Sequence, residues 1–162
     1  MLRLPPGIEI EDDTIEMRQR RLTRGLSHRF NNLYNALYEE FGDDVLDVIR
    51  RVSGEYGRSV AERARDREEV WDLDKVGRFI IRVFDGMNPE GEVTEFNDER
   101  VVIEIHKCPY PNMYPEVCRA HITMEEELVR GLNPGIEFRL EKARPREEGP
   151  CVYTIRKADN DE

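Results

Sequence analysis

The chain has 162 residues, of which 37% are charged and 38% hydrophobic, and its formal net charge is −10. That length is enough for one hydrophobic core, so we expect a single domain over residues 1–162. The acidic charge excludes nucleic acid as the main partner, because its phosphates would be repelled. No apolar run in the sequence reaches the length that crosses a bilayer, so we expect no membrane partner either.

Cysteine content and the first residues favour a reducing compartment. Three cysteines cannot all pair within one chain, and the opening Met-Leu-Arg-Leu-Pro-Pro lacks the pattern of a secretory signal. We therefore expect a cytoplasmic protein whose thiols are free, catalytic or metal-bound. The density of Arg and Glu is also typical of proteins from hot environments.

Helical patterns fill residues 12–86, after an extended arm over 1–11 that is rich in Pro and Gly. Apolar residues at three- and four-residue steps predict helices over about 12–41, 44–66 and 69–85. The predicted buried stripe of the first helix is Phe30, Leu33, Tyr34, Leu37 and Tyr38. That of the second is Val45, Val48, Ile49, Val52, Tyr56 and Val60. That of the third is Val76, Phe79, Ile80, Val83 and Phe84.

The hydrophobic period changes to that of strands over 92–157. Residues 93–96 and 100–107 are predicted to form a hairpin, and 136–142 and 151–157 two further strands. Between the two pairs, Pro115 suits the start of a helix that reaches about Leu132. The order ββαββ predicts an α+β fold, with the helical N-terminal half packed on an antiparallel sheet of about four strands. We expect a frayed tail over 158–162.

Soft metal ligands concentrate in the second half. Cys108 follows the hairpin, Cys118 and His121 share one face of the next helix, and Cys151 opens the last strand. Thiolates and imidazoles hold zinc or iron, so these four residues are the predicted ligands of a transition metal. Packing is the alternative for Cys151, because buried cysteine often behaves as a small hydrophobic residue.

Polar groups near these thiols are candidate ligand-binding residues. Strand alternation places Glu104 and His106 together, on the face opposite Ile105. Glu125 belongs to the same predicted helix as the soft donors, and Tyr153 to the last strand. If the segments meet in the fold, these residues would line a pocket for a small organic ligand.

The same helix also permits a catalytic reading. Cys118 lies in the first turn after Pro115, where the positive end of a helix dipole is expected to lower the pKa of a thiol. His121, one turn further on, could orient the substrate or protonate a leaving group. Cys118 and His121 are therefore the candidate catalytic pair of a cysteine-dependent hydrolase.

The run HKCPY, followed by VCRAHITMEEELVRGLNPGIEFRLEKA and EEGPCVYTI, resembles the end of the 4-vinyl reductase domain. The matching residues are Cys118, Glu141, Gly149, Cys151 and Tyr153. A further cysteine of that family, shortly after the Glu, is absent here, where Ala143 and Arg144 stand. The resemblance lies mainly in residues 101–157. It implies a binder of small hydrophobic molecules in a sensory or metabolic role and supports Cys118 and Cys151 as site residues.

The chain is also similar to the L-2-amino-thiazoline-4-carboxylate hydrolase-like group. The matching pieces are FGDD (41–44), EYGRS (55–59) and Cys108-Pro109. This resemblance implies hydrolysis of a thiazoline- or amide-type substrate.

Three functions thus stay open, and whether the chain is an enzyme stays open with them. The leading hypothesis is a small-molecule-binding domain, with or without a bound metal. The alternatives are the cysteine-dependent hydrolase and a protein-interaction module whose cysteines are only packed. A homodimer is compatible with each, because the first helix has an apolar stripe and a small sheet leaves an edge to cover.

Overall fold

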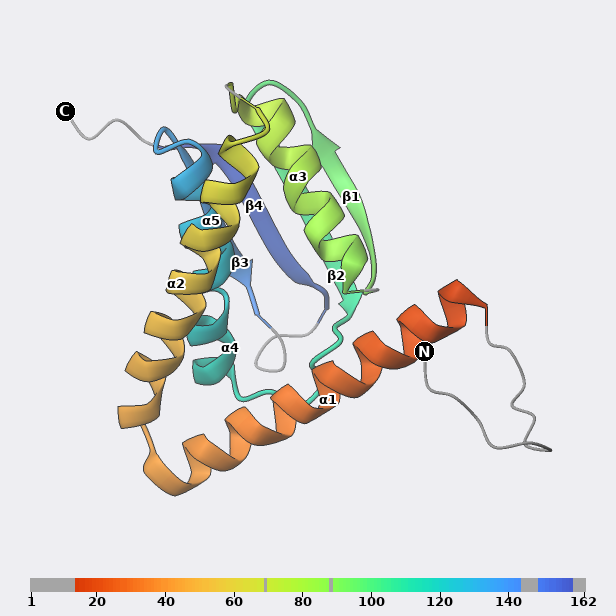
Figure 1. Ribbon diagram of the computed structural model, residues 1–162, viewed down its shortest axis with the longest axis vertical. Coiled ribbons are helices and arrows are strands. Elements are labelled where there is room, and N and C mark those ends of the chain that lie inside the picture. Colours follow the sequence, from red (N-terminus) through yellow and green to blue (C-terminus); the bar gives the residue numbers. More distant parts are fainter. Residues whose placement is uncertain (1–13, 69, 88, 144–148, 159–162) are drawn as a thin grey trace, which may run out of the picture.

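The computed structural model describes residues 14–68, 70–87, 89–143 and 149–158 and places helices against one face of a sheet (Figure 1). In chain order the elements are α1 (Ile15–Phe41), α2 (Asp44–Arg65), α3 (Leu73–Gly86), β1 (Glu90–Phe96), β2 (Arg100–Lys107), α4 (Pro115–His121), α5 (Thr123–Leu132), β3 (Ile136–Lys142) and β4 (Cys151–Lys157). The predicted α+β class is confirmed. The predicted arm over 1–11 and the tail after residue 158 lie outside the described residues.

The sheet has the strand order β1-β2-β4-β3, and every neighbouring pair is antiparallel. Alternation along β2 buries Val101, Ile103 and Ile105, as its pattern predicts. Ile105 is paired with Cys151 on β4, and Ile103 with Tyr153. One face of the sheet is therefore apolar, and it packs against the helices.

The single helix predicted over 115–132 is in fact two. Ile122 has a ψ of −8°, interrupts the helical path between α4 and α5, and is itself buried. Its carbonyl accepts hydrogen bonds from the N–H groups of Glu125 and Glu126, at 3.0 and 3.2 Å. This tightened turn changes the chain direction while it keeps an apolar side chain in the core.

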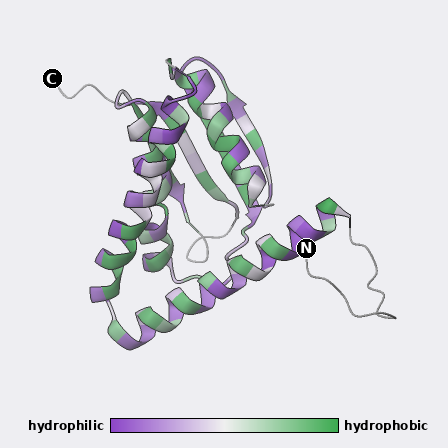
Figure 2. Cartoon of the chain, in the orientation of Figure 1, coloured by the Kyte–Doolittle hydropathy of each residue, from purple (hydrophilic) through white to green (hydrophobic). Residues whose placement is uncertain are grey.

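Part of the predicted apolar stripe of α1 faces away from the protein, which the sequence pattern did not predict. Its buried residues are Ser27 and Asn31, whereas Phe30 and Leu33 are 46% and 53% exposed. The other members of the predicted stripe, Tyr34, Leu37 and Tyr38, are partly buried against a small cluster with α2 and α4. The N-terminal part of α1 extends beyond the other elements, and hydrophobic bands recur along it (Figures 1 and 2). The prediction for Phe30 and Leu33 is wrong because periodicity shows an apolar face but not which way it points.

Helix α2 packs against α5 through small residues. The buried positions include Gly54, Gly57, Ala61 and Ala64. In contrast, Val48, Val52 and Tyr56 are about half exposed, at 48%, 48% and 58%, so their predicted burial is wrong. Small side chains let the two helix backbones approach closely. The face of α2 that packs against α5 is therefore the one with the small residues, and the larger apolar residues stay exposed.

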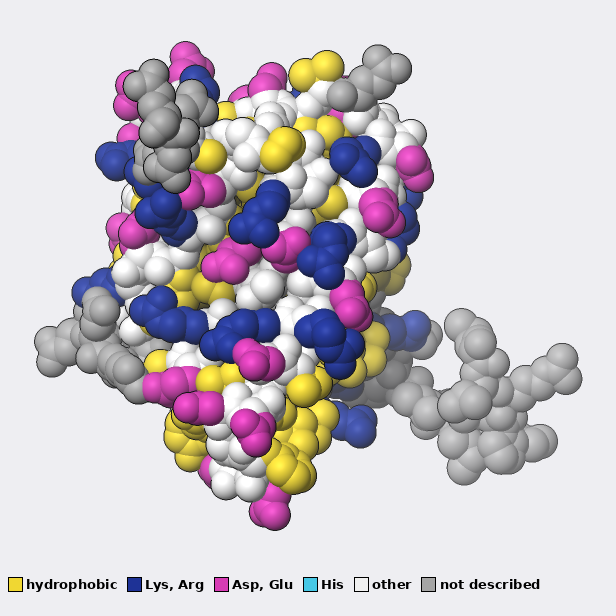
Figure 3. Space-filling model, turned by 90° about the vertical axis from the view of Figure 1, so that its left-hand side faces the viewer, with side chains coloured by type: hydrophobic (Ala, Val, Ile, Leu, Met, Phe, Trp, Pro, Cys, Tyr) yellow, Lys and Arg dark blue, Asp and Glu magenta, His cyan; other side chains and the backbone are white. Residues whose placement is uncertain are grey.

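The α2–α5 side of the surface carries intermixed acidic and basic side chains, while hydrophobic side chains gather at its lower end, where α1 meets α2 (Figure 3). The exposed apolar residues of that region include Phe41 and Val48. None of the helices in the described part of the chain combines the length and the apolar character that crossing a bilayer requires.

We expect Gly57→Ala to destabilise the fold. A Cβ atom at Gly57 would overlap the carbonyl oxygen of Met124, and a backbone atom cannot move aside as a flexible side chain can. Overpacking of this kind costs about 1–3 kcal/mol, which chemical denaturation would measure. The matched control is Gly25→Ala, at an open position of α1 with nothing within 4 Å, which should stabilise the protein by up to about 1 kcal/mol. Equal effects at the two positions would contradict the close contact.

Candidate functional site

An apolar cavity of about 420 Å³ lies between the helices and the inner face of the sheet. Its aromatic walls are Phe30, Tyr34, Tyr56, Phe84, Tyr110 and Tyr153. Its polar lining groups are few and include Ser53, His121 and Glu125. Small-molecule sites usually have volumes of about 300–1,000 Å³, and this cavity lies within that range. An apolar wall with a few polar groups is also typical of such sites.

The loop after β2 forms one wall of the cavity. The prolines that follow Cys108 end the strand, and the Cys108 sulfur then accepts a hydrogen bond from the Tyr110 N–H at 3.4 Å. Asn35 on α1 holds the rest of the loop, because its amide donates to the Asn112 carbonyl at 2.6 Å and its Oδ1 accepts from the Tyr114 N–H at 3.2 Å. These contacts fix Tyr110 between α1 and α4.

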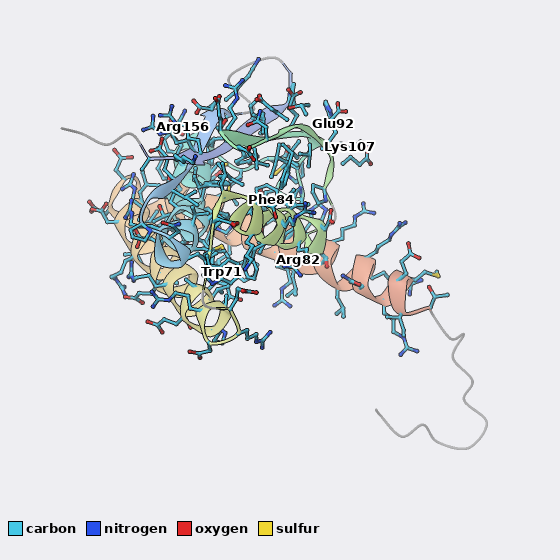
Figure 4. All side chains as sticks on the ribbon, turned by 90° about the horizontal axis from the view of Figure 1, so that it is seen from above. Trp71, Arg82, Phe84, Glu92, Lys107 and Arg156 are labelled. Carbon is cyan, nitrogen blue, oxygen red and sulfur yellow. The ribbon has the colours of Figure 1, made fainter. Side chains whose placement is uncertain are left out.

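Aromatic rings enclose His121. The ring centroids of Tyr34 and Tyr110 lie 5.7 and 5.1 Å from that of His121, and both pairs meet edge to face. Opposite them, Phe84 of α3 meets Tyr153 of β4 edge to face at 5.1 Å. The view in Figure 4 shows Phe84 on the helical side of the sheet. The cavity is therefore walled by rings from helices, loop and sheet.

The three cysteines come close together, as the predicted site requires. Cys108 and Cys118 line the apolar cavity, and the buried Cys151 lines an adjoining cleft with both of them. Burial, followed by the nearby Cys108 and Cys151, raises the pKa of the Cys118 thiol to about 12. The expected lowering of this pKa by the helix is therefore wrong, because α4 is only 7 residues long and its thiol is desolvated. The catalytic role of Cys118 with His121 stays a prediction.

The predicted metal ligands do not gather as tightly as a metal site requires. No three of Cys108, Cys118, His121 and Cys151, all within the described ranges, place their ligand atoms within 4.8 Å of one another. Tetrahedral zinc sites hold their ligands at about 2.0–2.3 Å from the ion, which brings those atoms closer together than this. This arrangement does not fit a bound ion, and the metal site stays a prediction.

Glu104 and His106 do not line the apolar cavity, although His106 lines the adjoining cleft with the three cysteines. Together with Glu92 they form the one group of three described ligand atoms within 4.8 Å, on an exposed part of β1 and β2. His106 Nε2 lies 3.4 Å from Glu92 Oε1. Figure 4 shows Glu92 on the side of the sheet away from Phe84. Of the predicted ligand-binding residues, only Glu125 and Tyr153 therefore line the cavity.

Two buried polar groups in the cavity have no hydrogen-bond partner among the described residues: Nδ1 of His121 and Oε2 of Glu125. Desolvation raises the pKa of Glu125 to about 7 and lowers that of His121 to about 4. Both shifts favour the neutral form inside an apolar site. At neutral pH the imidazole is therefore uncharged, and the carboxyl group is close to its titration midpoint.

Sequence reasoning missed several cavity residues, among them Tyr34, Ser53 and Tyr110. Tyr110 stands between two prolines in a predicted loop, and an aromatic residue in such a loop is a usable signal for a rigid wall. Ser53 carries no such signal, because a polar residue among exposed-looking neighbours on a helix is ordinary. Only the packing of α1 beside α2 brings Tyr34 and Ser53 to the cavity.

We expect Glu125→Gln to change the pH dependence of stability. The folded-state pKa of Glu125 is raised from 4.5 to about 7, so its stabilising protonated form is fully present below pH 4.5 and is lost as the pH rises through 7. Relative to the variant, the wild type should lose up to about 3 kcal/mol of unfolding free energy between about pH 5 and pH 8, as urea denaturation would measure. The pKa of His121 is shifted in the opposite direction, but His121 is present in both proteins, so its contribution cancels in the difference between their unfolding free energies. A difference that is constant with pH would show that Glu125 titrates normally.

Comparison with models of known protein families and with curated proteins gives no match. Among solved structures, the fold is similar to that of subunit 3 of a trafficking protein particle complex from Naegleria fowleri, in a crystal structure where that subunit is covalently bound to palmitic acid. The TM-score is 0.57 with 10% sequence identity, and the match covers 86% of this chain and 96% of that one. At this identity the likeness shows a shared fold.

Proposed function

We propose that this chain binds a small hydrophobic molecule in the apolar cavity. The observation that supports the proposal most is the cavity itself, about 420 Å³ walled by six aromatic rings and few polar groups. Burial of apolar ligand surface there would contribute about 25 cal/mol per Å². The structural neighbour is bound to palmitic acid, a molecule with a long apolar chain, and such a chain is the kind of group that these walls would favour.

Exposed apolar residues at the edge of the cavity give such a ligand a way in. Phe30, Val52 and Tyr56 line the cavity and are each about half exposed, at 46%, 48% and 58%. They come from α1 and α2, so the entrance lies between these two helices. A ligand entering there would pass along apolar surface before it reached His121 and Glu125.

We expect Val52→Trp to weaken ligand binding. The larger side chain would narrow the entrance, and since Val52 is 48% exposed it would not strain the core. With 1-octanol as a neutral probe, calorimetric titration should show affinity reduced by about tenfold, which is ~1.4 kcal/mol.

The matched control is Val48→Trp. Val48 is also 48% exposed and lies one turn earlier on α2, but it does not line the cavity. This variant should keep the wild-type affinity. No binding of 1-octanol to any of the proteins would refute the proposal, and equal weakening by both variants would place the entrance elsewhere.

A second candidate function is protein interaction, and the outward stripe of α1 favours it. Leu22, Leu26, Phe30 and Leu33 recur at three- and four-residue steps and are 46–66% exposed. Exposed apolar patches of this kind mark interaction sites. The structural neighbour is a subunit of a complex. The partner we favour is a second copy of this chain, in which two such helices cover each other.

Under this proposal we expect the double variant Leu26→Glu, Leu33→Glu to be monomeric where the wild type is dimeric. Both side chains are 53% exposed in the single chain, so the fold should survive while like charges oppose self-association. Sedimentation velocity over a range of concentrations would measure the oligomeric state. Asn32→Glu, an exposed position off the stripe on the same helix, is the control for added charge. A wild type that stays monomeric throughout would exclude the dimer.

A further inference from the structure

We propose that the ligand of the cavity is a hydrophobic amine, whose ammonium group pairs with the carboxylate of Glu125. This inference rests on the proposed ligand-binding function and names the chemical class of the ligand. The observations that carry it are the positions of the polar groups in the cavity and the charges around them.

Glu125 presents an acceptor that nothing in the described protein satisfies. Its Oε2 atom is buried, lines the cavity and has no hydrogen-bond partner among the described residues. A buried acceptor without a donor costs free energy, and a charged one costs more. The other polar groups of the cavity differ in this respect, because Tyr34 is hydrogen-bonded with Ser53, and Tyr110 with Ser27. A ligand that brings a hydrogen-bond donor to Glu125 would therefore complement the site.

His121 supplies a second unpaired acceptor atom to the lining of the cavity. Its Nδ1 atom is buried without a described partner, and burial keeps the imidazole neutral by lowering its pKa to about 4. Which ring nitrogen carries the proton is set by the bonds it makes, so Nδ1 can accept from a ligand when Nε2 is protonated. His121 is the last residue of α4 and Glu125 lies in the first turn of α5, and both line the same cavity. An ammonium group has three donors and no acceptor, so it suits a cavity whose buried polar atoms need donors.

The charges around Glu125 also favour a positively charged ligand over a negatively charged one. No Lys or Arg is among the described residues that line the cavity. The titratable groups that interact electrostatically with Glu125 are Tyr110, Cys118, Tyr153 and the neighbouring Glu126. The first three are neutral at ordinary pH, because burial raises the pKa of each. A cation would meet one negative charge in a low-dielectric site, where the attraction is strong, and an anion would be repelled.

The aromatic walls are compatible with a cation as well. Tyr34 and Tyr110 lie beside His121, and Phe84 and Tyr153 lie across the cavity. The faces of such rings attract ammonium groups. Their edges and the aliphatic walls suit the apolar body of the ligand.

A competing location for an anionic ligand is the adjoining cleft of about 790 Å³, which shares Cys108, Tyr110 and Cys118 with the cavity. Basic side chains line it, among them Arg20 and Lys107. These two are exposed and ion-paired, Arg20 Nη2 with Glu16 Oε1 at 2.8 Å and Lys107 Nζ with Glu90 Oε1 at 2.7 Å. Exposed, paired and screened charges attract an anion weakly, so the buried carboxyl of Glu125 should decide the selectivity.

Three probes with the same tail test the inference: 1-octylamine, 1-octanol and octanoate, each titrated calorimetrically into the full chain at about pH 8, where Glu125 is ionised. The amine should bind the wild type about tenfold more tightly than the alcohol, because it adds a charge-assisted hydrogen bond in a buried site. Octanoate should bind most weakly. Glu125→Gln should abolish the advantage of the amine over the alcohol, measured as the ratio of the two affinities, while the control Glu126→Gln should keep the wild-type order.

The outcomes separate the two proposals. If none of the three probes binds, the ligand-binding function fails, and this inference fails with it. If 1-octanol binds but the amine binds no more tightly, or if Glu125→Gln leaves the amine's advantage intact, only the inference is overturned. Tightest binding of octanoate would also overturn it, in favour of an anionic head group at the basic cleft. A thermal unfolding curve of each variant, recorded at the same pH, shows that the fold is intact.

Discussion

The contact between α2 and α5 is the constraint on which the site depends. A Cβ atom at Gly57 would overlap the Met124 carbonyl oxygen, and one at Gly131 would come within 2.7 Å of the Ala61 Cβ. The Arg58 guanidinium spans the same contact and donates to Glu127 at 2.9 Å. A close approach of two helices leaves little freedom in their relative position. It fixes α5, and with it Glu125 and the last turn of α4.

The cavity is the space that remains between the helices and the sheet because their side chains do not fill it completely. Helix α5 is held against α2, α3 covers the sheet through Phe84, and α1 meets the others mainly through its second half. The side chains that face the space between them are rings of limited flexibility, and rigid rings from different elements do not interlock completely. Burial of Ser27 and Asn31 in α1, in place of Phe30 and Leu33, leaves less apolar volume inside. The packing thus leaves an apolar cavity in which His121 Nδ1 and Glu125 Oε2 have no hydrogen-bond partner among the described residues.

The same packing decides the chemistry of the cysteines. A thiol at the start of an exposed helix is a plausible nucleophile, but Cys118 is desolvated and lies near two further thiols, so its pKa rises. His121 is likewise held neutral. A pair with these properties resembles the lining of a binding cavity more than an activated nucleophile and base. This is the physical reason to prefer ligand binding among the functions that the sequence left open.

The sequence by itself determined the α+β class and the approximate bounds of most helices and strands, but not the break at Ile122 or the strand order. The two-residue alternation of Val101, Ile103 and Ile105 and the prolines after Cys108 act locally, so their consequences can be read from neighbouring residues. It also indicated that Cys108, Cys118, Glu125 and Tyr153 belong to one region. Only the tertiary structure decided that Glu104 and His106 lie outside the apolar cavity, that Phe30 and Leu33 on α1 are exposed, and that His121 Nδ1 and Glu125 Oε2 have no hydrogen-bond partner among the described residues. Those properties depend on contacts between distant segments, and no local pattern encodes which face of a helix meets its neighbour.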